Sequence, residues 1–214
     1  MRNYDVIGLH HGFFADFGFE FHSSKFIYQK DLPWGQQVVF VQFTEYPEVN
    51  YLEYKLGVRI HQVEEIIHLF LPTLADYAER SITLIQTPDK IGKQIPARFV
   101  LENDSQLAEA IMAGETFFVT HGFYWLDEMI DPVKLEKAFA ERKEKSFRCH
   151  NFVYNCFRGV TLARLYNPND YQFLRNIYLK EIENRHLTPF NIGSFLQLLN
   201  YLDELEINSS FSHL

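Results

Sequence analysis

The sequence predicts an α+β protein in which an antiparallel β-meander in the N-terminal half packs against helices and the C-terminal half is helical. Apolar and polar residues alternate in "YLEYKLGVRIH", residues 51–61, which is the period of a half-buried strand. From about residue 62 the apolar residues recur at the spacing of an amphipathic helix. We therefore expect a single α+β domain over residues 1–214, within which a strand-rich lobe (1–103) and a helical lobe (104–214) can be drawn.

The N-terminal half is expected to begin with a short helix over residues 4–15 and to continue through extended segments. Turn-forming residues separate runs that are rich in β-branched and aromatic side chains, which is the pattern of strands joined by hairpins. The strands are expected at residues 19–30, 36–46, 51–61, 81–87 and 97–103.

The C-terminal half is expected to be helical. Asp131-Pro132 and Thr188-Pro189 each place a capping side chain before a proline, so both pairs mark helix starts. Residues 115–125 fit either a strand or a helix. The helices are expected at residues 62–78, with a kink at Pro72, and at 104–113, 131–144, 149–165, 168–185 and 189–206.

Composition narrows the classes of function. The chain of 214 residues carries 20 basic and 28 acidic side chains, for a formal net charge of −8, and its Lys and Arg residues are scattered. Nucleic-acid binding, which needs a basic surface to neutralise phosphates, is therefore disfavoured. The N-terminus lacks the apolar region of a signal peptide, no apolar run reaches the ~20 residues of a membrane span, and two cysteines fit a reducing compartment. We expect a cytoplasmic protein without a membrane helix.

Common catalytic and cofactor motifs are absent from the sequence. It contains no Gly-x-Gly-x-x-Gly, Walker loop, Gly-x-Ser-x-Gly, His-Glu-x-x-His or Cys-x-x-Cys. This argues against the common nucleotide-binding and hydrolase classes, and no cofactor is predicted.

The stretch "HQVEEIIH" raises the question of a metal site. On a helix its two histidines and two glutamates fall within about a 100° arc. Glu65-x-x-His68 and Glu183-x-x-His186 also have the spacing of di-iron carboxylate bundles. The apolar residues predict a buried side away from both pairs, so we interpret both as solvated faces and predict no metal. Those apolar residues are Val63, Ile66, Ile67 and Phe70 in the first helix and Phe173, Leu174, Ile177 and Tyr178 in the second.

The segment "SFRCHNFVYNC" raises the question of a thiol or zinc site. On a helix, Cys149 and Cys156 lie on one apolar line about 10 Å apart, which is too far for a disulfide or a shared zinc ion. His150 and Asn151 rotate away from Cys149. We predict buried structural thiols.

Three other histidines are candidates for a metal or ligand site. His10 and His11 point about 100° apart on a helix and rarely share one ion, so they are predicted to be a structural or surface pair. His121, beside Gly122 and close to Tyr124 and Trp125, could line an aromatic pocket, although a histidine satisfied within the core is the commoner case.

One face of the strand at 51–61 gives a positive indication of binding. Glu53, Lys55, Arg59 and His61 share it by alternation, and Gln42 and Thr44 are placed on the matching side of the neighbouring strand. The interpretations are a solvent-exposed sheet face or a concave polar surface that recognises a small molecule or a protein.

The order helix, "FGFEF", "KFIYQK", "QQVVFVQFTEY" and "YLEYKLGVRIH" resembles the opening of a bacterial family of uncharacterised proteins over about residues 4–70. The resemblance implies an α+β fold and a bacterial cytoplasmic origin, and it supplies no functional residues.

Two hypotheses of function follow. The first is a non-enzymatic binding or protein-interaction module that uses Lys55, Arg59 and His61. The second is a small-molecule enzyme with a pocket around His121, Tyr124 and Trp125.

Overall fold

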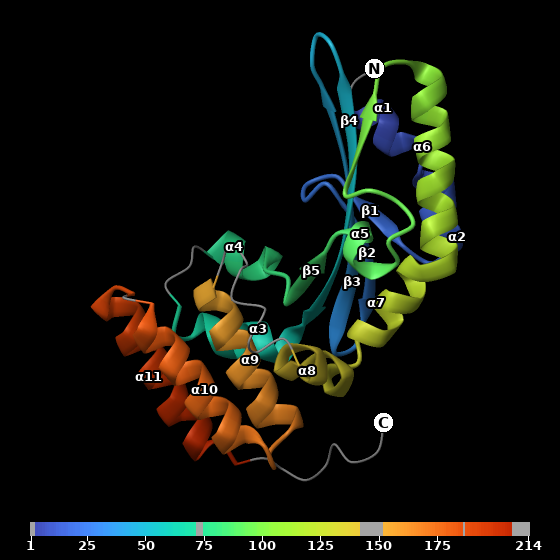
Figure 1. Ribbon diagram of the computed structural model, residues 1–214. Coiled ribbons are helices and arrows are strands. Elements are labelled where there is room, and N and C mark those ends of the chain that lie inside the picture. The colour runs from blue at the N-terminus through green and yellow to red at the C-terminus, as the bar shows by residue number, and fades with distance from the viewer. Residues whose placement is uncertain (1–2, 72–74, 142–151, 186, 207–214) are drawn as a thin grey trace. The chain divides into compact units, whose positions relative to one another are not determined.

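The computed structural model describes residues 3–71, 75–141, 152–185 and 187–206 (Figure 1). The chain divides into two compact units, and each unit is built from two separate stretches of sequence. Unit 1 comprises Met1–His61 and Ile82–Ile130, and unit 2 comprises Gln62–Ser81 and Asp131–Leu214. The N-terminal half contributes an antiparallel sheet and the C-terminal half contributes helices, so the predicted α+β class is confirmed.

Unit 1 is built on an antiparallel six-stranded sheet. Neighbouring strands follow the order β1-β2-β3-β4-β5, and β6 also pairs with β4. The strands β5 and β6 both pair with the long strand β4, at different positions along it. β5 pairs with Leu56–Val58 and β6 pairs with Asn50–Glu53. The strands are β1 (Glu20–His22), β2 (Ile27–Leu32), β3 (Gly35–Glu45), β4 (Asn50–Ile60), β5 (Leu84–Gln86) and β6 (Arg98–Leu101).

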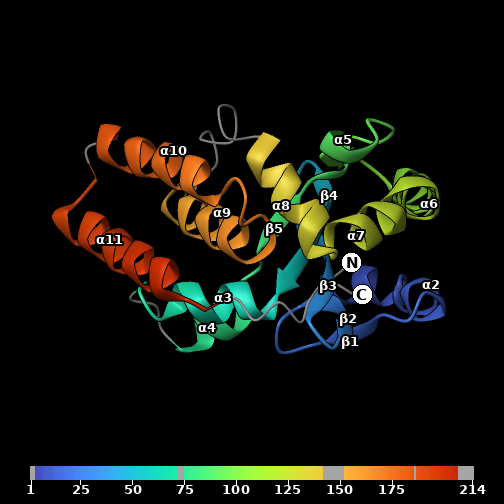
Figure 2. The same ribbon diagram turned by 90° about the horizontal axis from the view of Figure 1, so that it is seen from below.

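One face of this sheet, here called the inner face, is covered by helices and is apolar. The alternating side chains of β4 that the sequence predicted to be buried are buried: Leu52, Tyr54, Leu56, Val58 and Ile60. Figures 1 and 2 show the covering helices on one side of the sheet. They are α1 (Asn3–Gly8), α2 (His11–Asp16), α6 (Asp104–Phe117), the π-helical turn η1 (Phe118–Gly122) and α7 (Phe123–Met129), while the short α5 (Pro88–Ile91) follows β5.

The ambiguous segment 115–125 is helical and runs from α6 through η1 into α7. Its approach to the sheet depends on Gly114, because a Cβ atom there would lie 2.8 Å from the hydroxyl of Tyr54. The ring of Phe118 then packs edge-on against the same tyrosine, at 5.6 Å between centroids. A helix that contacts the sheet this closely contributes much of the aromatic core of unit 1.

The adjacent histidines His10 and His11 fasten the N-terminal helices to two different strands. The buried His10 donates from Nδ1 to the carbonyl of Val6 (2.9 Å), so its Nε2 accepts from the Tyr54 hydroxyl (2.8 Å). His11 Nδ1 lies 2.7 Å from the hydroxyl of Tyr28, which itself donates to the backbone. The structural role predicted for this pair is therefore confirmed.

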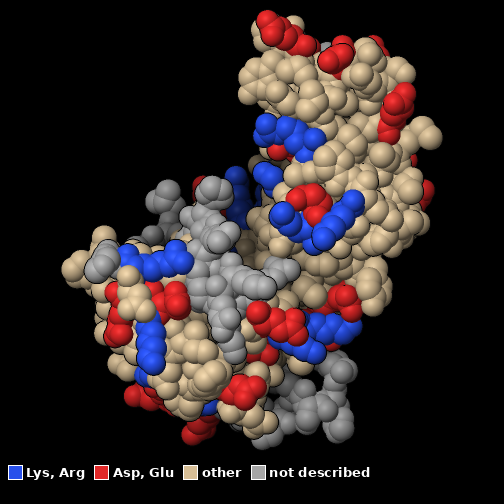
Figure 3. Space-filling view, in the orientation of Figure 1, with Lys and Arg blue, Asp and Glu red and all other residues tan. Residues whose placement is uncertain are grey.

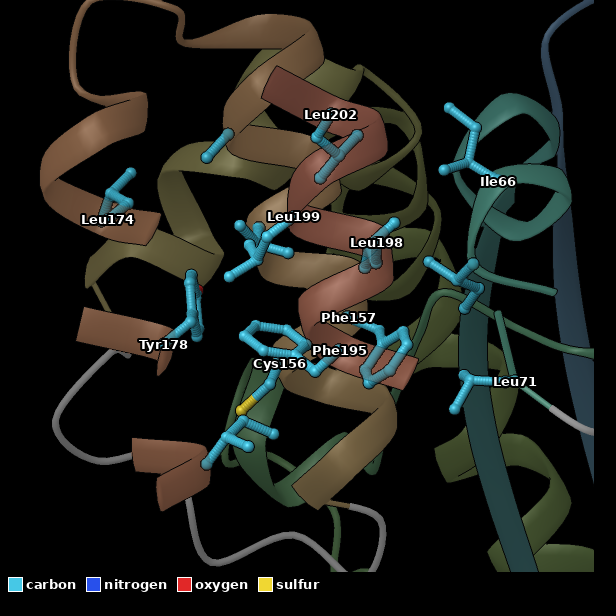
Figure 4. Close-up of a cluster of buried hydrophobic side chains, with 14 of the residues drawn as sticks. Ile66, Leu71, Cys156, Phe157, Leu174, Tyr178, Phe195, Leu198, Leu199 and Leu202 are labelled. Carbon is cyan, nitrogen blue, oxygen red and sulfur yellow. The ribbon is translucent and has the colours of Figure 1, made fainter. Parts of the chain in front are cut away.

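Unit 2 consists of helices around an apolar core. Figure 4 shows side chains of this core, including Cys156, Phe157 and Phe195. The helices α9 and α10 cross closely at Gly159, where an added Cβ atom would overlap the hydroxyl of Tyr178. The helices are α3 (His61–His68), whose first residue belongs to unit 1, α4 (Ala75–Arg80), α8 (Pro132–Glu141), α9 (Phe152–Tyr166), α10 (Tyr171–Asn184) and α11 (Pro189–Glu204).

The structure differs from several expectations. The helix expected over residues 4–15 is two short helices, because the chain turns at Leu9 and His10 to reach Tyr54. Phe173 is 60% exposed and so is not part of the buried side of α10, which Tyr171, Leu174, Tyr178 and Ile182 form instead. The expected lobe boundary at residues 103–104 falls inside unit 1, since α6 packs on the sheet. Pro72 lies outside the described residues.

Candidate interaction surface

The side of the sheet away from α6 carries mostly polar and charged side chains in three rows. The strand register places Phe40 opposite Lys55, and it aligns Gln42 with Glu53 and Arg98. Directly opposed residues of antiparallel strands point to the same face, and rows two residues apart are separated by about 7 Å. All of these side chains are exposed or half-buried. We call this surface the outer face: Phe40, Gln42, Thr44, Tyr51, Glu53, Lys55, Arg98 and Val100.

The outer face has one neutralised cation and one cation without an ionic partner. Arg98 forms an ion pair with Glu53 (3.1 Å), and its guanidinium lies 4.8 Å from the centroid of the Tyr51 ring. Lys55 forms no ion pair with any residue that the structure describes. In Figure 3 the Lys and Arg side chains over β4, β6 and α5 have Asp and Glu side chains among them. Lys55 is therefore the group of the outer face that an anionic group of a partner can pair with.

The residues predicted to bind do not all lie on this surface. Lys55 does, and so do Gln42 and Thr44, which the register places opposite Glu53 and Tyr51 as expected. Arg59 is only 9% exposed, so it is a packed residue rather than an accessible one. His61 comes after the last residue of β4 and starts α3, where its N–H donates to the carbonyl of Trp34.

The second predicted group, around His121, lies on the helical side of unit 1. The half-buried ring of His121 stacks on Phe117, and it packs so tightly against Gly92 that a Cβ atom there would come within 2.9 Å of it. Tyr124 is 66% exposed and its hydroxyl donates to Glu128 (3.1 Å), while Trp125 is half-buried. These contacts give His121 a packing role, and the pocket hypothesis stays a prediction.

Sequence reasoning missed a buried ion pair in unit 2. Glu64, interpreted above as part of a solvated face, is fully buried and is held by two hydrogen bonds from Arg158, of 2.8 and 2.9 Å. Burial by itself raises the pKa of Glu64. The charge of Arg158, its two hydrogen bonds and the polar groups of His68 and Ser81 nearby outweigh that effect and hold the pKa far below its ordinary value. The signal in the sequence is an arginine within the apolar run of α9, which needs a buried anion.

His68 and Ser81 extend this network but do not form a catalytic triad. His68 Nε2 lies 2.9 Å from the hydroxyl of Ser81 and 3.6 Å from the carboxylate of Glu64. A triad requires the two nitrogens of the histidine to face the serine and the acid separately. Here one nitrogen faces both groups, and the Ser81 hydroxyl donates to the carbonyl of Ala78 (2.8 Å). The network therefore connects α3 and α4 to α9 and is structural.

The remaining metal and thiol predictions have separate outcomes. Within the described ranges, no three side chains of His, Cys, Asp or Glu are grouped so that they could hold a metal ion. Glu183 is exposed as expected, and its partner His186 lies outside the described residues. Cys156 is a buried free thiol, which confirms its predicted core position, while residues 149–151 lie outside the described part of the chain.

Comparisons with known proteins give no relative from which a function could be carried over. No protein-family model, no curated protein and no solved structure matches the chain. No helix among the described residues combines the length and apolar character needed to cross a bilayer.

Proposed function

We propose that this protein is a non-enzymatic interaction module that binds a protein partner through the outer face of unit 1. The observation that carries the proposal is the division of the sheet into two faces. The inner face is closed by helices and aromatic side chains, whereas the outer face presents aligned polar, charged and aromatic groups. Rigid sheet positions fix these groups without the entropy cost of ordering a loop, which favours recognition.

The composition of the outer face resembles that of a protein-binding surface more than that of a plain solvated face. Interfaces are enriched in aromatic residues and arginine, and here Phe40, Tyr51 and Arg98 lie in neighbouring rows. The ring of Tyr46 extends the aromatic area, at 5.7 Å from Tyr51. The buried free thiol of Cys156 is compatible with a reducing compartment, and a cytoplasmic location is part of the proposal.

The proposal is tested with a photo-crosslinking amino acid placed at Gln42, an exposed position of the outer face. Crosslinking is carried out in the cells that express the protein, and the adducts are identified by mass spectrometry. We expect one dominant partner protein, whose yield falls about tenfold in Lys55→Glu because a like charge then faces the partner's anionic group.

The matched controls are a crosslinker at Gln172 and the substitution Lys180→Glu, both at exposed positions of α10 in unit 2. Neither control should give or remove the dominant adduct. If the adducts at Gln42 and Gln172 are the same, or if Lys55→Glu leaves the yield unchanged, the outer face is not the binding surface.

A further inference from the structure

We infer that β6 is a docking edge that takes up an additional strand, namely an extended, acidic segment of another protein. This inference deepens the proposed function and rests on it, because the added strand would lie beside the outer face. It specifies the chemistry of the partner and the part of the surface that the partner contacts first.

The backbone of β6 is paired on one side only. Among the strands that the structure describes, its four residues pair with β4 alone. Across the described residues, the N–H and C=O groups of residues 98–101 make no hydrogen bond apart from that ladder. In an antiparallel pair, alternate residues direct these groups away from the partner strand. Part of the hydrogen-bonding capacity of β6 therefore faces outward, which is the arrangement that strand addition uses.

The side chains of β6 do little to protect this edge. Natural edge strands are usually shielded by short length, charges, prolines or bulges. β6 is short, with four residues, and its last three side chains are apolar. β6 contains no proline and carries a single charged residue, Arg98, at its first position. Val100 is 60% exposed on the outer face. An exposed aliphatic side chain on an unpaired edge favours a binding role for that edge.

The outer face determines which segment fits beside β6. A strand added there would place every second side chain next to Arg98 and Val100, because same-face residues recur at a period of two. Arg98 is paired with Glu53 through one nitrogen, and its half-exposed guanidinium has further donors beside which a carboxylate fits. An aliphatic group fits beside Val100. Lys55 supplies a further cation on the same face. The preferred segment thus has a carboxylate and an aliphatic side chain two residues apart.

A single-stranded nucleic acid fits the same surface less well. Such ligands bind sheets by stacking bases on open aromatic faces. The ring of Tyr51 is already covered by the guanidinium of Arg98, at 4.8 Å. The net charge of −8 also opposes a polyanion. We therefore assign the edge to a protein segment.

The test uses a defined probe, a capped seven-residue peptide of threonines with glutamate at the second and sixth positions and valine at the fourth. It is titrated to ~1 mM into the isotopically labelled full chain, because a short added strand binds weakly. We expect amide shifts at residues 98–101 and slower hydrogen exchange there on binding. A peptide with lysine in place of glutamate should bind about tenfold more weakly, because it faces Arg98 and Lys55.

Two substitutions and one matched control locate the edge. Val100→Glu and Arg98→Glu should each weaken binding of the peptide about tenfold, because each places a carboxylate on the edge beside the glutamates of the peptide. Val119→Glu changes a valine of nearly equal exposure, 58%, in η1 and should have no effect. All three positions are at the surface, so the variants are expected to fold.

Other outcomes would overturn the inference in distinguishable ways. Shifts at Gln42 and Lys55 without protection of residues 98–101 would remove the edge but leave the outer face as a binding surface. No shift at 1 mM, or binding that Val100→Glu leaves unchanged, overturns strand addition, while the crosslinking experiment judges the proposed function separately. Dimerisation of the chain that Val100→Glu abolishes would assign the edge to a second copy. Binding of an oligonucleotide in place of the peptide would overturn both proposals.

Discussion

A buried polar contact in unit 1 and one in unit 2 differ in their chemistry. The contact in unit 1 is neutral and joins His10 to the hydroxyl of Tyr54, although the same unit also packs the charged Arg59. The contact in unit 2 is ionic and joins Glu64 to Arg158. A neutral pair loses little when it leaves water, whereas an ion pair loses much and depends on both partners. The two units should therefore respond differently to mutation and to acid.

The largest expected effect is the removal of one partner of the ion pair. Arg158→Met leaves the carboxylate of Glu64 buried and uncompensated, which should lower the free energy of unfolding by about 3–5 kcal/mol. The double variant Glu64→Leu with Arg158→Met should recover most of this loss, because no charge is then buried. Chemical denaturation of the wild type, the single variant and the double variant measures both effects. Equal stability of the single and double variants would show that the pair is hydrated rather than buried.

This ion pair also shows what sequence patterns can and cannot predict. Alternation in β4 predicted its buried residues correctly, because a strand in a sheet has one fixed period. The sequence also predicted the apolar side of α3 correctly. How many residues of α3 are buried on that side depends on which helix packs against it. Glu64 lies at its margin and is buried only because α9 brings Arg158 to it. Arg158 in the apolar run of α9 indicates a buried anion, but a contact between residues 94 apart in sequence leaves no local pattern that identifies Glu64 as the partner.

The candidate surface could be predicted in part for the same reason. The alternation placed Lys55 on the accessible face of β4, and the register confirmed Gln42 and Thr44 beside it. Arg98 and Val100 were missed, because no pattern showed that β6 pairs with the first part of β4 rather than with β5. Alternation along β4 places Arg59 on the same face as Lys55, but Arg59 is buried. Its burial depends on tertiary contacts, which the alternation does not predict.

A smaller effect is expected from two glycines of unit 2. Gly159→Ala places a methyl group where it overlaps the hydroxyl of Tyr178, and overpacking of this kind costs about 1–3 kcal/mol. Gly193→Ala in α11 meets nothing within 4 Å, so the better helix propensity of alanine should stabilise the protein by up to ~1 kcal/mol. Thermal denaturation of the two variants compares the same change in two surroundings. A stabilising Gly159→Ala would contradict the close crossing of α9 and α10.

The smallest effect is the acid response of unit 1. Burial lowers the pKa of His10 below its ordinary value of 6.5, because a charged imidazole would lose solvation. The folded state then binds fewer protons than the unfolded state, so stability is complete above the ordinary pKa. It decreases as the pH falls through about 6.5 towards the lowered folded value, by at most ~1.4 kcal/mol per pH unit for one proton.

Fluorescence separates this acid response from events in unit 2, because both tryptophans of the chain, Trp34 and Trp125, lie in unit 1. The denaturation midpoint measured by tryptophan fluorescence should fall between pH 7 and pH 5. The variant His10→Gln should be less stable at pH 7 and should lose the part of the pH dependence of stability that His10 causes.

Glu64 of unit 2 has a lowered pKa, so its contribution to stability is retained until the pH falls below its ordinary value of 4.5. Hydrogen exchange of α9 should therefore change only at lower pH than the tryptophan signal. If both signals change together near pH 6, the neutral and ionic networks are not independent, and the contrast between the two units does not hold.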